Sequence, residues 1–163
     1  VNLSKGQIGS DLANVLGGLI VSSISNAAFS RHGTAEELRR PFMLYVDEFH
    51  SFTTESFANM LSETRKYALG VTLSQQYVDQ SDRSVFEAIL GNVGTLLSFR
   101  IGAADGSIVS RQLGKVRAED VINQPNYSAF VRLMVKGAQT KAFSMTTLPP
   151  KANLARAQDS TQT

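Results

Sequence analysis

Two adjacent acids, Asp47 and Glu48, are the residues of this sequence best suited by type and position to do chemistry. They directly follow five apolar residues, 42–46, a short run that is typical of a buried parallel strand. Ligands of open α/β sheets bind beyond the carboxyl ends of the strands, so paired acids at this point suit a binding site. In nucleotide hydrolases the first such acid supports the water shell of Mg²⁺, and the second polarises the attacking water. The plainer alternative is a strand that ends in a polar loop.

A second apolar run, 69–73, is also followed by polar side chains, here Gln75 and Gln76. A polar side chain at the tip of a strand beside the acids can sense the γ-phosphate of a nucleotide or align the attacking water. We expect Gln75 to take this role and consider Gln76 the weaker candidate.

Helices alternate with strands through residue 113, which predicts an α/β fold with a parallel sheet. The runs 42–46, 69–73 and 95–99 are expected to be buried parallel strands, because none alternates apolar and polar residues. A hairpin over 129–147, turning at 136–138, is expected at an antiparallel edge. Helices are predicted over 12–30 behind Ser10 and Asp11, over 57–68 between Thr54 and Gly70, over 85–90 between Asp82 and Gly91, and over 105–113 before Gly114.

The first of these helices lacks charge over 19 positions, which is the length of a membrane span. Only 11 of the 19 residues are apolar, and no basic segment precedes them as in a signal peptide. We therefore expect a helix buried inside a soluble protein, with an apolar stripe that begins at Leu12, Val15, Leu16 and Leu19. Residues 149–163 are rich in Ala, Gln, Ser and Thr and are expected to form a flexible tail after a domain portion over 1–148.

The composition describes a globular chain and removes several classes of site. The 163 residues are 42% hydrophobic and contain no cysteine, which excludes disulfide scaffolds, Cys-ligated zinc and thiol nucleophiles. The net charge of +2 argues neither for nor against a nucleic-acid partner. His32 and His50 do not form a zinc pattern, and no G-x-S-x-G elbow supports a serine nucleophile. His50 is expected to be a partly exposed loop residue.

Five phrases of the sequence together resemble the DNA-pumping ATPases of the HerA and FtsK superfamily, and within it the coupling proteins of conjugation and type IV secretion. The phrases are VNLSKGQIG, VDEFHSF, LSETRKYALGVTLSQQY, GNVGTLLSFRIGAAD and PNYSAFVRLMVKG, and they run nearly end to end. The resemblance implies a three-layer, RecA-like fold with a mostly parallel sheet, ATP and Mg²⁺ as cofactors, a homohexameric ring and DNA as the transported substrate. It also implies secretion-channel or relaxase proteins as partners and a cytoplasmic location at the inner face of the bacterial membrane, with no membrane span in this chain.

The resemblance assigns roles to individual residues. Asp47 and Glu48 match the Walker B acids, with Asp47 holding Mg²⁺ through water, and Gln75 matches the sensor glutamine that contacts the nucleotide. Arg65 matches the arginine that family members insert into the neighbouring subunit's nucleotide site, where its charge would neutralise the γ-phosphate. A solvated cation at a helix end is its alternative role. Arg100 is a second candidate for the intersubunit site or for the nucleotide, with an ion pair to Asp105 as its alternative.

One departure from the family pattern bears on function, since no G-x-x-x-x-G-K-[ST] phosphate loop occurs in the sequence. In the family this loop lies upstream of the segment that resembles residues 1–9. We therefore expect the carboxyl-terminal portion of a motor domain, without the phosphate-loop strand, that is inactive by itself. The alternative is a non-hydrolytic docking module of the same fold that binds a secretion or DNA-mobilisation partner.

Overall fold

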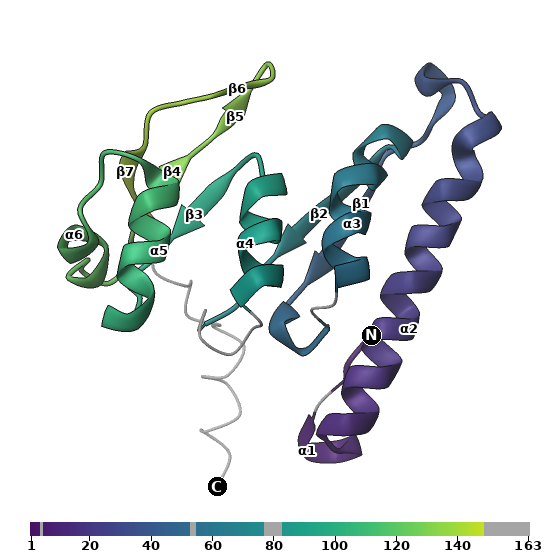
Figure 1. Ribbon diagram of the computed structural model, residues 1–163, viewed down its shortest axis with the longest axis horizontal. Helices are drawn as coiled ribbons and strands as arrows, with labels where there is room; N and C mark the ends of the chain where they lie inside the picture. Colours follow the sequence, from purple (N-terminus) through teal and green to yellow (C-terminus); the bar gives the residue numbers. More distant parts are fainter. Residues whose placement is uncertain (4, 53–54, 77–82, 149–163) are drawn as a thin grey trace, which may run out of the picture. The chain divides into compact units, whose positions relative to one another are not determined.

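The computed structural model describes residues 1–3, 5–52, 55–76 and 83–148. Two compact units are present: unit 1 comprises Val1–Gly94 with Ile101–Asp105, and unit 2 comprises Thr95–Arg100 with the described residues from Gly106 onward (Figure 1). Each unit is described by itself. The predicted caps Thr54 and Asp82 and the predicted tail 149–163 lie outside the described residues.

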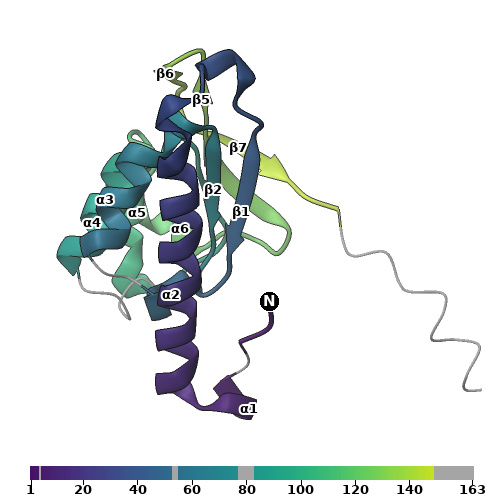
Figure 2. The same cartoon turned by 90° about the vertical axis from the view of Figure 1, so that its right-hand side faces the viewer.

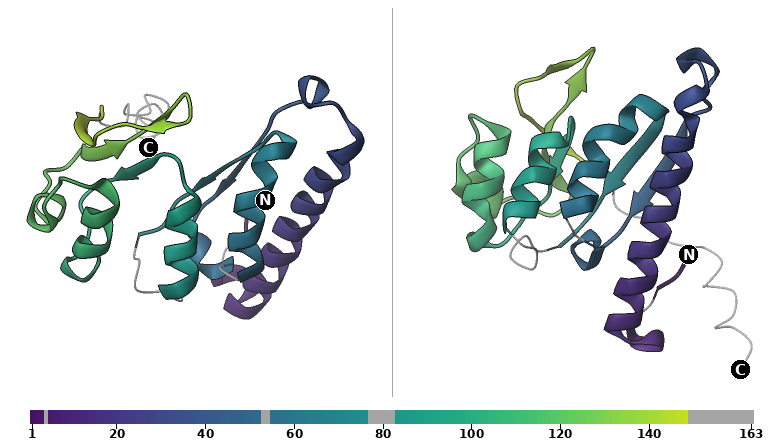
Figure 3. Two further views of the ribbon diagram at one scale, coloured as in Figure 1. Left: turned by 45° about the horizontal axis from the view of Figure 1, so that its top comes forward. Right: turned by 45° about the vertical axis from the view of Figure 1, so that its right-hand side comes forward.

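Unit 1 is an α/β unit built around two parallel strands. The strands β1 (Phe42–Val46) and β2 (Leu69–Leu73) pair in register from Phe42 opposite Leu69 to Val46 opposite Leu73. Its helices are α1 (Lys5–Ile8), α2 (Ser10–Phe29), α3 (Glu55–Thr64) and α4 (Arg83–Asn92), and its 3₁₀ turns are η1 (Ser30–Gly33), η2 (Glu36–Leu38), η3 (Phe49–Phe52) and η4 (Arg65–Tyr67). The helix α3 lies between α2 and α4 and packs against both (Figures 1 and 3).

The parallel pair confirms the first two predicted strands, but β1 is not buried as expected. Met43 and Tyr45 are 54% and 72% exposed, whereas Val46 is 8% exposed. Residues that alternate along a strand point to opposite faces of the sheet. Within the part of unit 1 that the structure describes, no element covers the face that carries Met43 and Tyr45, so an apolar run alone did not predict burial on both sides.

The helix α2 confirms the predicted helix but turns a different face to the rest of the unit. Its buried residues are mostly small and recur three or four positions apart: Ala13, Gly17, Val21, Ser25 and Ala28. The predicted apolar stripe is instead exposed, with Leu12 at 51% and Leu19 at 60%. Small side chains allow close approach of α2 to η3 and α3, and this packing decides the orientation (Figure 2).

The same helix satisfies the length and composition of a membrane span. Among the described helices, Ser10–Gly33 is the single stretch that passes this test, and 28% of its most apolar 18-residue window is buried. The sequence predicts that this helix is buried inside the protein, and this prediction is wrong for most of the helix surface. Its amino end is capped by Gly9, in a left-handed conformation with φ 81°, and no side-chain capping bond from Ser10 is present.

The end of α3 also differs from the prediction. The α-helix stops at Thr64, the 3₁₀ turn η4 follows, and Ala68 adopts a left-handed conformation with φ 59°. Gly70, the predicted stop, lies inside β2, where an added Cβ would come 2.6 Å from the Met43 sulfur. The glycine therefore serves close packing against β1 rather than helix termination.

Unit 2 is built on an antiparallel sheet in the order β3–β4–β7, formed by Leu96–Ser98, Ser128–Arg132 and Phe143–Thr146. The strands β5 (Met134–Val135) and β6 (Ala138–Gln139) form the predicted hairpin, whose turn places Lys136 and Gly137 at positive φ. Two helices contribute buried Val109, Leu113 and Val121: α5 (Ala103–Leu113), which belongs to unit 2 from Gly106 onward, and α6 (Ala118–Ile122). The third predicted strand is present, but its hydrogen-bonded partner β4 is antiparallel, which corrects the expectation of three parallel strands.

Candidate functional site

The carboxyl ends of β1 and β2 bring the predicted acids and the polar end of β2 together. The Ser74 hydroxyl donates to Asp47 Oδ1 at 2.5 Å, and the Glu48 amide donates to the same oxygen at 3.1 Å. Asp47 itself is exposed. Because β1 and β2 are parallel and in register, the two strand ends lie at one edge, as the sequence predicts. Ser74 was not singled out by the sequence; its place one residue before Gln75 was the available signal.

Main-chain hydrogen bonds fix the turn that carries the acids. The Ser74 amide donates to the Val46 carbonyl at 2.9 Å, and the Phe49 amide donates to the Ser74 carbonyl at 3.2 Å. Phe49 is 4% exposed and stacks on Phe86 with ring centroids 6.5 Å apart. The turn after β1 is thus anchored to β2 by its backbone and to the core by Phe49.

Glu48 adopts a left-handed backbone conformation with φ 49°, which is uncommon for a residue with a Cβ. Its Oε2 lies 3.3 Å from His50 Nδ1, and its side chain is 37% exposed. The His50 side chain is 14% exposed, which agrees with the expected partly exposed histidine, and the residue lies in the 3₁₀ turn η3. The conformation of the turn and the His50 contact orient a carboxylate that still reaches solvent.

Gln75, at the same strand end, has a side-chain amide that lacks partners among the described residues. Both its Oε1 and Nε2 are shielded from solvent and have no hydrogen bond to any residue that the structure describes. Gln76, the weaker candidate, is exposed. A buried amide without partners costs free energy, on the order of 1–3 kcal/mol, unless a ligand or water satisfies it.

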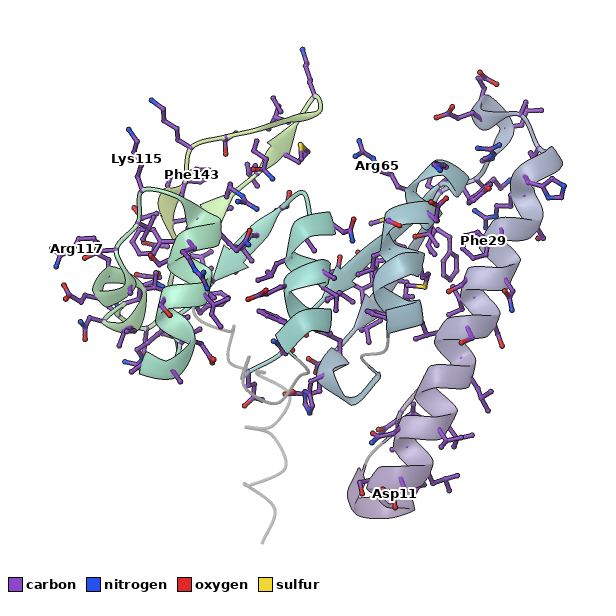
Figure 4. All side chains as sticks on the ribbon, viewed as in Figure 1. Asp11, Phe29, Arg65, Lys115, Arg117 and Phe143 are labelled. Carbon is purple, nitrogen blue, oxygen red and sulfur yellow. The ribbon has the colours of Figure 1, made fainter. Side chains whose placement is uncertain are left out.

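Arg65 lies at the opposite end of the strands from Asp47. It begins η4, just before the amino end of β2, and projects beyond the last turn of α3 (Figure 4). Five strand residues span roughly 16 Å at about 3.3 Å each, so Arg65 does not join Asp47 within one chain. Its side chain is exposed and forms no hydrogen bond or ion pair with the described residues.

Arg100 belongs to unit 2, where its Nη2 donates to Asn126 Oδ1 at 3.2 Å. It lines an open groove of about 590 Å³ together with Phe99, Asn126 and Tyr127. Asp105, its predicted alternative partner, is 4% exposed. Within unit 2, the side-chain partner that the structure gives Arg100 is the Asn126 amide oxygen, and the pairing with Asp105 stays a prediction.

The edge formed by Asp47 and Ser74 fits a magnesium ion that a nucleotide brings with it. Mg²⁺ prefers oxygen ligands, keeps several waters and is commonly held by one or two carboxylates plus phosphates. Asp47 offers an exposed carboxylate and Ser74 a hydroxyl at this edge. Among the described residues, no group of three or more histidines or acids could hold a metal ion by itself.

Comparison with known proteins identifies the fold. No family model matches the sequence, and no curated protein matches it. The solved structures that match include the bacterial conjugative coupling protein TrwB, with a TM-score of 0.65 and 17% identity over 80% of this chain and 36% of the TrwB chain. TrwB in complex with a non-hydrolysable GTP analogue matches with a TM-score of 0.66 and 20% identity over 82% of this chain and 37% of its own.

A viral protein shares the same fold. The genome packaging NTPase B204 from Sulfolobus turreted icosahedral virus 2, in complex with AMPPCP, matches with a TM-score of 0.56 and 14% identity over 80% of this chain and 62% of its own. This chain thus spans little more than a third of the TrwB structures that it matches. Over about four fifths of its length, the chain has the fold of the conjugative coupling protein TrwB, as the sequence resemblance implies.

Proposed function

We propose that this chain supplies part of the ATP-hydrolysing site of a ring-forming ATPase that moves DNA in conjugation or type IV secretion. The observation that carries the proposal is the hydrogen bond between Ser74 and Asp47 at the carboxyl ends of a parallel strand pair, with the unsatisfied amide of Gln75 on the next residue. The fold shared with TrwB supports it, since TrwB structures are known with nucleotide analogues and with ADP and Mg²⁺.

Each residue of this edge has a distinct task in the proposed reaction. Bound Mg²⁺ neutralises phosphate charge in such sites. Asp47, oriented by Ser74, binds the water shell of the ion. Glu48, held by its left-handed turn and by His50, accepts a proton from the attacking water. The Gln75 amide, which can both donate and accept, aligns that water against the γ-phosphate.

The proposed site is completed by a second copy of the chain. Arg65 lies at the opposite edge from Asp47, exposed and without a partner among the described residues, so it is free to reach a nucleotide held by a neighbour. A guanidinium inserted in this way neutralises charge on the transferred phosphoryl group. We therefore assign Glu48 to its own subunit's nucleotide and Arg65 to the neighbour's. Arg100, in unit 2, stays a candidate for the intersubunit site or for the nucleotide.

The proposal is tested by mixing two inactive variants in rings. The subunits of these rings are the proposed longer protein, which carries a phosphate loop in addition to this chain. Glu48→Gln and Arg65→Ala subunits alone are each expected to lose ATPase activity, by on the order of 1,000-fold for the arginine. Mixed rings contain some interfaces with both residues intact, so a fraction of the activity should return. Mixed rings as inactive as the single variants would remove the intersubunit assignment.

A non-hydrolytic docking module is the second candidate, favoured by the exposed apolar side chains of α2 and β1, including Leu19, Met43 and Tyr45. In that case Glu48→Gln would leave the biological activity of the complete protein unchanged. DNA transfer measured with the same variant separates the two candidates, since a motor requires Glu48 and a docking module does not.

A further inference from the structure

The turn that carries Arg65 is held by two other arginines, which the sequence did not single out. Arg39 donates from Nη1 to the Lys66 carbonyl and from Nε to the Thr34 carbonyl, the latter at 2.8 Å. Arg31 donates from Nη1 to the Tyr67 carbonyl at 3.1 Å and also to the Arg40 carbonyl. Two consecutive carbonyls of η4 are thus bound by guanidinium groups that come from the connection between α2 and β1.

The physical need for these bonds comes from the end of α3. The last carbonyls of a helix have no intrahelical partner, and cations are favourable there because of the helix dipole. Arginine satisfies such carbonyls well because its planar fork presents several donors in fixed directions. Arg39 reaches two carbonyls from different segments at once, so it ties η4 to the chain before β1.

Aromatic contacts also hold this turn. The Arg39 guanidinium lies 5.4 Å from the centre of the Tyr67 ring, within the range of a cation–π interaction. Phe29, at the end of α2, packs edge-on against Tyr67 with ring centroids 5.6 Å apart. Tyr67 therefore contacts both Phe29 at the end of α2 and the Arg39 guanidinium, so these contacts also restrain η4.

The two cationic residues that begin η4, Arg65 and Lys66, differ in whether their side chains have a partner. The Lys66 ammonium lies 2.9 Å from Glu63 Oε2, and this hydrogen bond raises the pKa of Lys66. Arg65 has no side-chain partner among the residues that the structure describes. The turn thus presents one free guanidinium, next to a paired lysine, on a backbone that Arg31 and Arg39 restrain.

We infer that Arg31 and Arg39 are positioning residues that hold η4 so that Arg65 reaches the nucleotide of a neighbouring subunit. The inference rests on the proposed function, and it adds two residues that do not touch the nucleotide themselves. Misplacement of a catalytic group by about 1 Å can lower a rate by about 100-fold, so restraint of this turn has a kinetic consequence.

The test replaces Arg39 in rings of the proposed longer protein, which carries a phosphate loop in addition to this chain. Arg39→Ala is expected to lower kcat at least about tenfold with KM little changed, because the lost interaction is made in the transition state. Arg40→Ala is the matched control: it removes the same charge one residue away, from an exposed side chain with no bond to the described residues, and should retain activity. Arg39→Lys keeps the charge but not the fork, so it should restore little of the loss.

A double variant separates positioning from general stability. In the Arg65→Ala background, Arg39→Ala should cause no further loss of kcat, because the residue that it positions is already absent. The inference would be overturned if Arg39→Ala lowered kcat by the same factor in the Arg65→Ala background. It would also be overturned if Arg39→Ala alone kept the wild-type kcat, or if Arg39→Lys restored it fully. If Arg65→Ala alone is fully active, the proposed role of Arg65 has failed; if Arg65→Ala is inactive while Arg39→Ala is normal, only the positioning role has failed.

Discussion

At the scale of single residues, the edge beyond β1 and β2 holds features that stability alone would not select. Glu48 sits in a left-handed conformation, and the Gln75 amide is buried without a partner among the described residues. Each costs free energy on the order of 1–3 kcal/mol. Glu48 directly follows the exposed Asp47, and Gln75 directly follows Ser74, whose hydroxyl bonds Asp47. Unfavourable features that gather at one place are typical of a functional site.

Gln75 allows stability and function to be separated. Gln75→Met keeps the length of the side chain and removes the unsatisfied amide, so we expect the chain to be more stable by about 1 kcal/mol. In the active assembly the same variant should lose hydrolysis. Urea unfolding of the 163-residue chain measures the first effect, with Gln76→Met as the matched control because Gln76 is exposed. A clear loss of stability in Gln75→Met would show that the amide has a partner in the folded chain.

At the scale of elements, α2 shows how packing selects the face of a helix. Its leucines fall at helical spacing, yet the buried stripe consists of smaller residues, including Ser25 at 6% exposed. The Ser25 hydroxyl donates to the Val21 carbonyl at 2.7 Å and faces Met60 of α3. Close helix packing favours small side chains at the contact, so α2 turns this face toward α3 and leaves Leu12, Val15 and Leu19 exposed.

A pair of serine variants tests this orientation. Ser25→Leu places a large side chain in the contact with α3 and should lower the free energy of unfolding by about 1–3 kcal/mol. Ser23→Leu, on an exposed position of the same helix, should change it by less than about 0.5 kcal/mol. Urea denaturation of both variants gives the comparison. Equal effects of the two substitutions would show that Ser25 does not face the core of unit 1.

At the scale of the whole molecule, the 163 residues hold the acids and the glutamine of the proposed site but no phosphate loop. Triphosphate affinity in such sites comes mainly from a cradle of backbone N–H groups and a lysine. The sequence has no such loop, and beyond β1 and β2 Asp47 and Glu48 supply negative charge. Two carboxylates repel a triphosphate unless Mg²⁺ lies between them.

This balance of charges predicts the behaviour of the chain by itself. We expect weak binding of MgATP, without measurable hydrolysis, because Glu48 has no positioned γ-phosphate to act on. Calorimetric titration with MgATP and a phosphate-release assay measure the two properties. Micromolar affinity, or turnover that disappears in Glu48→Gln, would reveal a complete site in these 163 residues.

The sequence by itself determined the local elements and the position of the acids. A short apolar run followed by two acids predicts a strand end, and parallel pairing then places Asp47 near the end of β2. These features depend on residues close in the chain, so periodicity and turn residues are enough to predict them. The family resemblance added the fold; the likeness to TrwB confirms an α/β fold, but the described strands form one parallel pair and antiparallel sheets rather than a mostly parallel sheet.

Only the tertiary structure decided which surfaces meet. The Ser74 bond to Asp47 joins residues 27 positions apart, and Arg39 reaches Lys66 across the same separation. The buried face of α2 and the antiparallel partner of β3 likewise depend on segments distant in the chain. Such contacts depend on the shape and donor geometry of both partners at once, whereas a sequence pattern describes one partner at a time. The bond from Arg39 to the Lys66 carbonyl therefore became visible only when the folded chain placed η4 beside the connection that leads into β1.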